Sequence, residues 1–245
     1  MRLYGLIGYP LTHSFSEQYF TEKFAREHLD DCVFRPFAIT NIGELPLLLK
    51  ANPLLKGLGV TIPYKEQVLP LVTFLSGEVK QIGATNSIKI SGNNLLAYNT
   101  DIIGFENSFV KLLKPHHKKA LVLGTGGASK AVQFVLKKLN IDFLVVSRSE
   151  VLRSNVINYT RLTGSIMNEY TIIVNCTPVG MWPNDNVCVN IPYDYLTTDH
   201  YVFDLIYKPA KTLLIKKAEK CGATIQNGYD MLIIQAEESW KLWNS

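Results

Sequence analysis

The sequence predicts a two-domain α/β protein, and its second domain is expected to contain a doubly wound parallel sheet. Short apolar runs alternate with helical patterns along most of the 245 residues. A glycine-rich stretch in the second half separates a predicted strand from a predicted helix. The last helical pattern carries apolar and aromatic residues on more than one side, as expected of a helix that packs between two bodies.

The first hundred residues are predicted to form a small α/β unit. Ser16 is the expected N-cap of its first helix, because a serine hydroxyl accepts hydrogen bonds from the first helical turn. Gly92 and Asn93 are the expected turn of a hairpin over residues 86–101. The other expected elements are strands over 3–9, 32–39 and 55–62 and helices over 16–29 and 42–52.

Strands and helices alternate again after residue 101. A helical pattern over 102–115 ends at Pro115, since proline cannot continue a helix. This alternation implies parallel strands joined by right-handed crossovers. The expected elements are strands over 119–124, 142–149, 171–178 and 201–207 and helices over 128–140 and 231–244.

Composition and charge exclude several classes of protein. The net charge is +4, and the densest basic cluster, residues 114–119, has no interleaved aromatic residues, so we expect no nucleic-acid partner. No run approaches ~18 apolar residues, so we expect no membrane association. The four cysteines form no CxxC pair and no metal-ligand spacing, so we expect reduced thiols, a cytoplasmic location and no metal.

The glycine-rich stretch "LVLGTGGASKA" is typical of a dinucleotide-binding turn. Gly124 permits a tight turn, and Gly126 and Gly127 let the backbone approach a pyrophosphate at the helix N-terminus. The usual third glycine position holds Ser129, so the motif is imperfect. The alternative is an ordinary glycine-rich connection between a strand and a helix.

The end of the next strand favours NADP over NAD. An NAD-binding protein usually places an acidic residue there to accept a hydrogen bond from the ribose 2′-hydroxyl. This chain has Ser147, Arg148 and Ser149 instead, and an arginine flanked by hydroxyl donors suits a 2′-phosphate. The alternative is a surface arginine in a loop.

Polar residues follow the predicted strands of the first unit. Ligands of open α/β sheets bind beyond the carboxyl ends of strands, so these side chains are expected to converge. Hydroxyls, an amide, an amine and a carboxylate suit a polyhydroxylated, negatively charged small molecule. Taken singly, each residue also has a structural explanation as a cap, a turn residue or a solvated lysine. The set comprises Ser14, Ser16, Thr61, Lys65, Asn86, Asn99, Thr100 and Asp101.

Taken together and in chain order, these motifs resemble the shikimate dehydrogenase family. The resemblance implies NADPH-dependent reduction of 3-dehydroshikimate to shikimate in aromatic amino-acid (chorismate) biosynthesis. It implies a substrate-binding domain over 1–101 plus 229–245, and a linking helix with a Rossmann-type NADP-binding domain over 102–228. The motifs that carry it are "GYPLTHSFS", "VTIPYK", "GATNS", "YNTDIIG", "GTGGASKA", "NCTPVGM", "FDLIYKP" and "GYDMLIIQA".

The resemblance also implies residue roles at matching positions. The catalytic pair would be Lys65 and Asp101. The substrate-binding residues would be Ser14 and Ser16 for the carboxylate, Thr61, Asn86 and Gln235 for the hydroxyls, and Tyr207 from the cofactor side. The cofactor-binding residues would be Gly124, Gly126, Gly127, Ala128 and Ser129 at the pyrophosphate, Ser147, Arg148 and Ser149 at the adenosine phosphate, and Leu205, Gly228 and Met231 at the nicotinamide.

Lys65 is the expected general acid. Reduction of a ketone by a hydride leaves an alkoxide that needs a proton, and a positioned acid contributes about 10²–10⁴-fold. We expect Lys65 to donate that proton, and to accept it in the reverse direction, while Asp101 orients the ammonium group.

Three alternatives stay open from the sequence. An NAD-preferring quinate/shikimate dehydrogenase is disfavoured by Arg148, and a folate-linked methylene dehydrogenase is not expected to carry the "YNTD" and "MLIIQA" motifs. A non-catalytic nucleotide-binding sensor would be expected to lose the pair Lys65 and Asp101, and both are present. The oligomeric state, monomer or homodimer, is also open.

Overall fold

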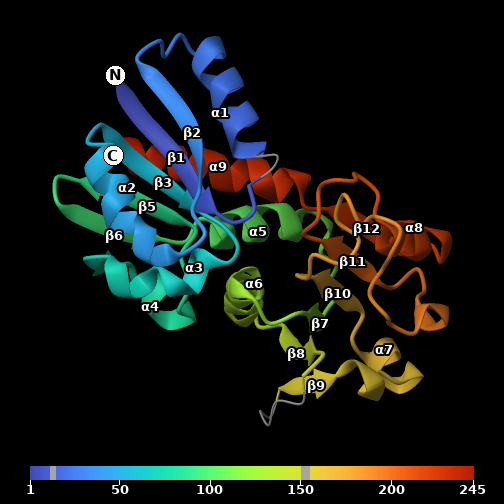
Figure 1. Cartoon of the computed structure of the whole chain (residues 1–245). Helices are drawn as coiled ribbons and strands as arrows, with labels where there is room; N and C mark the ends of the chain where they lie inside the picture. Colours follow the sequence, from blue (N-terminus) through green and yellow to red (C-terminus); the bar gives the residue numbers. More distant parts are fainter. Residues whose placement is uncertain (12–14, 150–154) are drawn as a thin grey trace. The chain divides into compact units, whose positions relative to one another are not determined.

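Two six-stranded sheets organise the chain, one in each of two units (Figure 1). The computed structural model describes residues 1–11, 15–149 and 155–245. Unit 1 comprises Met1–Thr100 and Ala236–Ser245, and unit 2 comprises Asp101–Gln235. The predicted α/β fold class is confirmed.

The sheet of unit 1 is mixed, with strand order β2-β1-β3-β5-β6-β4. Strand β5 runs antiparallel to both neighbours, while the other pairs are parallel. The predicted hairpin is β5–β6, and its turn residue Gly92 has φ +57°, a conformation that favours glycine. The elements are β1 Arg2–Gly8, α1 Phe15–Arg26, β2 Cys32–Ala38, α2 Leu45–Ala51, β3 Leu55–Val60, α3 Tyr64–Gln67, β4 Phe74–Leu75, α4 Gly77–Ile82, β5 Ser87–Ser91 and β6 Asn94–Tyr98.

Helix α1 lies over the sheet of unit 1 through aromatic side chains. Phe20 is 2% exposed and stacks on Phe34 of β2, with ring centroids 4.8 Å apart. The helix begins at Phe15, so Ser16 lies inside its first turn and the predicted N-cap role is wrong. The sequence expectation placed the start too late because the first apolar residue of the helical face is Phe15 itself.

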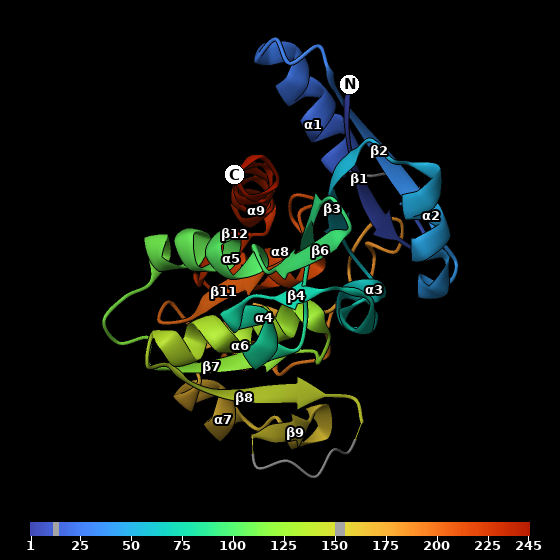
Figure 2. The same ribbon diagram turned by 90° about the vertical axis from the view of Figure 1, so that its left-hand side faces the viewer.

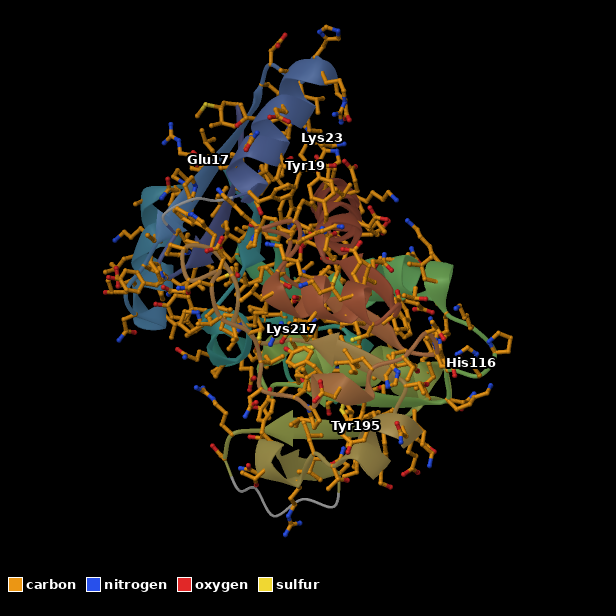
Figure 3. All side chains as sticks on the ribbon, turned by 90° about the vertical axis from the view of Figure 1, so that its right-hand side faces the viewer. Glu17, Tyr19, Lys23, His116, Tyr195 and Lys217 are labelled. Atoms are coloured by element: carbon orange, nitrogen blue, oxygen red, sulfur yellow. The ribbon has the colours of Figure 1, made fainter. Side chains whose placement is uncertain are left out.

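An ion-pair cluster ties α1 to the last helix, α9 (Tyr229–Asn244). The Lys23 side chain is 5% exposed, and its Nζ lies 2.9 Å from Glu237 Oε2 and 2.8 Å from Glu27 Oε1. The Tyr19 hydroxyl also donates to Glu237. Figure 3 shows Tyr19 and Lys23 on the side of α1 that faces α9. The free-energy cost of burying the Lys23 ammonium group is offset because the carboxylates of Glu27 and Glu237 both pair with it.

The sheet of unit 2 is fully parallel, with strand order β12-β11-β10-β7-β8-β9 (Figure 1). Figure 2 shows β8 between β7 and β9 in this sheet. This strand order is the doubly wound arrangement, and the order reverses between β7 and β10. A ligand of such a sheet binds beyond the carboxyl ends of the strands at that switch point. The elements are α5 Asp101–Phe109, β7 Lys119–Leu123, α6 Gly127–Lys138, β8 Asp142–Ser147, β9 Val156–Asn158, α7 Gly164–Glu169, β10 Ile172–Asn175, β11 Tyr201–Asp204, α8 Leu213–Lys220 and β12 Thr224–Asn227.

Helices α5 and the first part of α9 pack closely in unit 2. A side chain at Gly104 would lie 2.7 Å from the Met231 carbonyl oxygen and 3.1 Å from Gln235 Cβ. The two helices therefore approach to a distance that only glycine allows at this position. This contact fixes the part of α9 that carries Gln235 against the helix that Asp101 begins.

Across the described ranges 1–11, 15–149 and 155–245, no helix has the length and apolar character needed to cross a membrane. All four cysteines lie in these ranges, and each has a free thiol.

Candidate active site

The polar residues of unit 1 gather at one edge of its sheet. The register pairs Ile7 with Val60, Gly59 with Ser87, and Ser87 with Tyr98. The carboxyl ends of β1, β3 and β6 therefore meet the amino end of β5 at this edge. The predicted residues Thr61, Lys65 and Asn86 all leave the sheet here.

Lys65 is held by the backbone around it. Strand β3 ends at Val60, and the hydroxyl of buried Tyr64 donates to the Ile39 carbonyl oxygen at 2.6 Å. The Lys65 carbonyl oxygen accepts the backbone N–H of Thr85 at 2.8 Å. The side chain of Lys65 is half-buried. The lysine therefore occupies a fixed position at the edge that carries Thr61 and Asn86.

Asn86 belongs to a buried hydrogen-bond chain. Its Nδ2 donates to Thr100 Oγ1 at 2.9 Å, and its Oδ1 accepts the backbone N–H of Thr100 at 2.7 Å. The Thr100 and Ser239 hydroxyl oxygens lie 2.9 Å apart. This chain joins the start of β5, the end of β6 and the last part of α9. Sequence reasoning missed Ser239, which sits in a helix with no motif around it.

Asp101 follows Thr100 directly, is 5% exposed and begins α5. A carboxylate in the first turn is stabilised by the positive end of the helix dipole. Asp101 belongs to unit 2 and Lys65 to unit 1, so their catalytic pairing stays a prediction.

Four further residues predicted for the substrate site fall at different places. Ser14 lies outside the described residues, and Ser16 is half-buried in the first turn of α1. Gln235 is half-buried on α9, where its Nε2 donates to the Leu232 carbonyl oxygen at 2.9 Å. Tyr207 follows β11 in unit 2, and burial raises the pKa of its phenol. These substrate contacts stay predictions.

The glycine-rich turn of unit 2 has room for a ligand at the start of α6. Gly124 has φ +102°, and a side chain there would lie 3.0 Å from Thr177 Cγ2, so the turn needs glycine. Gly126 has φ −74°, which any residue adopts, and a side chain there would meet no protein atom within 4 Å. Gly126 is exposed, so the fold itself does not require glycine there, and an exposed helix N-terminus without a side-chain cap suits a dinucleotide pyrophosphate.

The first turn of α6 offers backbone N–H groups rather than a serine hydroxyl. Gly127, Ala128 and Ser129 are its first three residues, whose N–H groups have no partner within an α-helix. The Ser129 side chain is fully buried, and its hydroxyl accepts from Gln133 Nε2 at 3.0 Å. Ser129 thus fills the place of the third glycine, where the helix packs on the sheet.

The predicted phosphate-binding residues lie at the end of β8. Ser147 is 7% exposed, and its hydroxyl accepts the backbone N–H of Ser149 at 3.1 Å. Arg148 and Ser149 are exposed. Sequence reasoning missed Asn158, whose Nδ2 donates to the Arg148 carbonyl oxygen at 3.0 Å. Asn158 pairs with Ser147 across β8 and β9, a contact that only the sheet register reveals.

The residues expected beside the nicotinamide lie next to the carboxyl end of β11. The Leu205 N–H donates to the Asn175 carbonyl oxygen at 3.0 Å, and the Gly228 N–H donates to the Ile206 carbonyl oxygen at 3.2 Å. A side chain at Gly228 would lie 2.0 Å from the Leu205 carbonyl oxygen, so only glycine fits there. Met231 is 6% exposed in the first turn of α9.

A buried carboxylate at this edge was not predicted. Asp204 ends β11, is fully buried, and is hydrogen-bonded by Asn175 and Thr212. Burial raises the pKa of Asp204 to about 6, against the opposing effect of these hydrogen bonds.

A depression of about 550 Å³ lies at the opposite edge of the same sheet, where β7 and β10 begin. His116, Asn168 and Asp199 line it together with the ion-paired side chains Lys119 and Glu169. Dinucleotides and substrates bind at carboxyl ends in this class of sheet, so the candidate site is the carboxyl edge. The described residues include no cluster of three or more His, Cys, Asp or Glu side chains placed to hold a metal ion.

Comparison with known proteins identifies the family. Residues 6–88 match the model of the shikimate dehydrogenase substrate binding domain. Shikimate dehydrogenase (NADP(+)) of Aquifex aeolicus is 35% identical over 251 residues, which cover 99% of this chain and 91% of that protein.

Two solved structures have the same fold along the chain. Shikimate 5-dehydrogenase of Thermus thermophilus, in complex with NADP(H) and shikimate, is 28% identical, with a TM-score of 0.85 and coverage of 99% of this chain and 93% of that one. Quinate dehydrogenase of Corynebacterium glutamicum, in complex with NAD, is 26% identical, with a TM-score of 0.85 and the same coverage. From the full-length match to a relative above 30% identity, we conclude that this chain belongs to the shikimate dehydrogenase family.

Proposed function

We propose that this chain catalyses the reversible, NADP-dependent reduction of 3-dehydroshikimate to shikimate in aromatic amino-acid biosynthesis. The observation that carries the proposal is the glycine-rich turn between β7 and α6, where the helix begins after the exposed Gly126 with no side-chain cap. It lies in a chain whose first 88 residues include a match to the family's substrate-binding domain. A nucleotide site and a polar substrate edge in one chain suit an oxidoreductase better than a binding module.

The two halves of the reaction divide between two segments of the chain. Residues 1–101 and 229–245 form the substrate-binding domain in this proposal, and residues 102–228 bind NADP. Backbone N–H groups of Gly127 and Ala128 hold the pyrophosphate, and Arg148 binds the 2′-phosphate. When bound, the nicotinamide supplies or accepts the hydride. Leu205, Gly228 and Met231 line its ring.

The substrate is held through its carboxylate and hydroxyls. Ser14 and Ser16 bind the carboxylate, while Thr61, Asn86 and Gln235 bind the ring hydroxyls. The amide of Asn86 is oriented by its hydrogen bonds to Thr100, so its position at the polar edge is fixed. Tyr207 approaches from the cofactor side.

Lys65 moves the proton. Its ammonium group donates to the carbonyl oxygen of the substrate as negative charge develops there, and it takes the proton back during oxidation. Asp101 orients the ammonium group. The four free thiols suit a reducing compartment, and we propose that the enzyme works in the cytoplasm.

The test follows the absorbance of reduced nicotinamide in four reactions of the wild-type protein. Shikimate and quinate are each supplied with NADP and with NAD. We expect fast turnover with shikimate and NADP and little with the other three pairs, because Arg148 replaces the acidic residue of NAD enzymes. Equal or faster turnover with NAD or quinate would instead make this chain an NAD-preferring quinate/shikimate dehydrogenase. No turnover with any pair would favour the non-catalytic sensor.

A further inference from the structure

The buried carboxylate of Asp204 joins three segments at the carboxyl edge of the unit 2 sheet. Its Oδ1 accepts from Asn175 Nδ2 at 2.9 Å and from the Ile206 N–H at 3.1 Å. Its Oδ2 accepts from Thr212 Oγ1 at 2.6 Å. Asp204 is fully buried and Thr212 is 1% exposed, so water does not compete for these bonds.

These hydrogen bonds close the loop 205–211 at its base. The loop connects Asp204 to Thr212, and the Asp204 carboxylate accepts hydrogen bonds from Ile206 near its start and from Thr212 directly after its end. The neighbouring strand end fixes it further, since Asn227 Nδ2 donates to the Ala210 carbonyl oxygen at 2.9 Å and the Gly228 N–H donates to Ile206. The loop carries Leu205 and Tyr207, the two residues placed at the nicotinamide and the substrate in the proposed function.

The same network reaches the loop that follows β10. Asn175 Oδ1 accepts the N–H of Thr177 at 3.0 Å and its hydroxyl at 2.7 Å. Thr177 in turn lies against Gly124 of the glycine-rich turn. The Asn175 amide and the Asp204 carboxylate thus link the ends of β10 and β11, and Thr177 brings the turn after β7 into packing contact with them.

A buried carboxylate is a costly way to hold a loop if stability alone is at stake. Removing a carboxylate from water carries a large penalty, and apolar replacements of buried charges are often as stable. What a carboxylate adds is the ability to accept from three donors at fixed angles. That property suits the orientation of a loop whose side chains must meet a substrate within a fraction of an ångström.

We propose that Asp204 and Thr212 are positioning residues, whose mutual hydrogen bond closes the loop 205–211 and sets Tyr207 and Leu205 for hydride transfer. This inference rests on the proposed function, because the roles of Tyr207 and Leu205 come from it. Neither Asp204 nor Thr212 touches substrate or cofactor in this proposal.

The test compares three threonine variants. Thr212→Val removes the hydroxyl at nearly constant volume, and Thr212→Ser keeps it. Thr212 also caps α8, where its hydroxyl accepts the Ile215 N–H at 3.3 Å. Thr163→Val is the control for loss of a cap, since the exposed Thr163 caps α7 through the Ile166 N–H at 3.4 Å and lies outside the Asp204 network. Both valine variants therefore lose one helix cap, but only one loses the hydrogen bond that closes the loop.

We expect Thr212→Val to change kcat for shikimate but not the KM for NADP. Loss of one buried hydrogen bond to a carboxylate is expected to lower kcat for shikimate about tenfold in Thr212→Val. The KM for NADP should stay within about twofold of wild type, because the α6 N-terminus is untouched. Thr212→Ser should recover most of kcat, and Thr163→Val should leave it unchanged.

Amide hydrogen exchange of residues 205–211 provides a readout besides activity. Exchange there should quicken about tenfold in Thr212→Val and in neither other variant. If wild type turns over shikimate and Thr212→Val matches Thr163→Val in kcat and exchange, the positioning role is overturned while the proposed function stands. If wild type has no activity on shikimate, the proposed function fails and this inference fails with it.

Discussion

At the scale of single residues, the position of Lys65 follows from local chemistry that the sequence displays. Strand β3 ends at Val60, and Tyr64 anchors the next turn through its hydrogen bond to Ile39. The backbone of Lys65 is bound by Thr85 at the polar edge. The backbone of the lysine is thus held by its covalent neighbours and by the hydrogen bonds of Tyr64 and Thr85.

Lys65→Met tests the proton-transfer role. We expect kcat for shikimate oxidation to fall about 10²–10⁴-fold, because methionine keeps the length of the side chain but offers no proton. The melting temperature should change little. Lys56→Met, at an exposed position on β3, is the matched control and should keep wild-type kcat. A Lys65→Met enzyme with normal turnover would remove Lys65 from the mechanism.

Asp204 predicts a pH dependence of stability. Burial raises its pKa to about 6 in the folded protein, whereas the ordinary aspartate value is 3.8. Between these values the folded state binds more protons than the unfolded state, so stability falls as pH rises from about 4 to 6. The shift corresponds to a loss on the order of 3 kcal/mol. The nearby Tyr193 phenol stays neutral throughout, since burial raises its pKa.

Asp204→Asn removes this titration. Urea unfolding at pH 4 and at pH 7 should therefore show the stability of the variant rising relative to wild type by about 2–3 kcal/mol between the two conditions. The comparison cancels every other titrating group. If the difference in the free energy of unfolding between variant and wild type is the same at both pH values, the pKa of Asp204 is not raised in the folded state.

At the scale of elements, patterns within a short stretch of sequence predicted most of the fold. Apolar runs located strands β1, β2, β3, β7, β8, β10 and β11, and the hairpin turn at Gly92 was confirmed. The glycine-rich turn was also placed correctly between β7 and α6. In these cases the residues that determine the structure, such as a glycine that adopts positive φ or the apolar residues of a buried strand, are adjacent in the sequence.

Elements and networks whose formation depends on residues distant in the chain were not predicted from the sequence. Strand β9 has only three residues, and its pairing with β8 defines it more than its own composition does. Asp204 lies within an apolar run, and no sequence motif marks its hydrogen-bond partners Asn175 and Thr212. Such networks become visible only when the register of the sheet aligns the strand ends.

At the scale of the whole molecule, the chain leaves unit 1 at Thr100 and re-enters it at Ala236. The returning segment completes the aromatic core of that unit. Trp243 is 5% exposed and stacks on Tyr4, with ring centroids 5.5 Å apart, and a side chain at Gly57 would collide with its ring. The Tyr4 hydroxyl donates to Asn244 Oδ1 at 2.8 Å. The core of unit 1 therefore depends on the last ten residues of the chain.

Trp243→Ala should destabilise unit 1 selectively. Truncation of a buried tryptophan leaves a cavity, and the expected loss in the free energy of unfolding is about 3–5 kcal/mol. Hydrogen exchange should quicken in β1, β2 and β3, whereas β7 and β10 of unit 2 should keep wild-type rates. Trp182→Ala is the matched control, because Trp182 is 42% exposed and contacts the Lys208 ammonium, so its loss should cost less than about 1 kcal/mol.

A second substitution at position 243 distinguishes the contribution of ring packing from that of the indole N–H. Trp243 Nε1 is buried and finds no hydrogen-bond partner among the described residues, so Trp243→Phe removes an unsatisfied donor while keeping an aromatic ring. We expect Trp243→Phe to recover most of the stability lost in Trp243→Ala. Equal acceleration of exchange in β1 and β7 of Trp243→Ala would show instead that the two units unfold together, and the C-terminal segment would then stabilise the whole chain rather than unit 1.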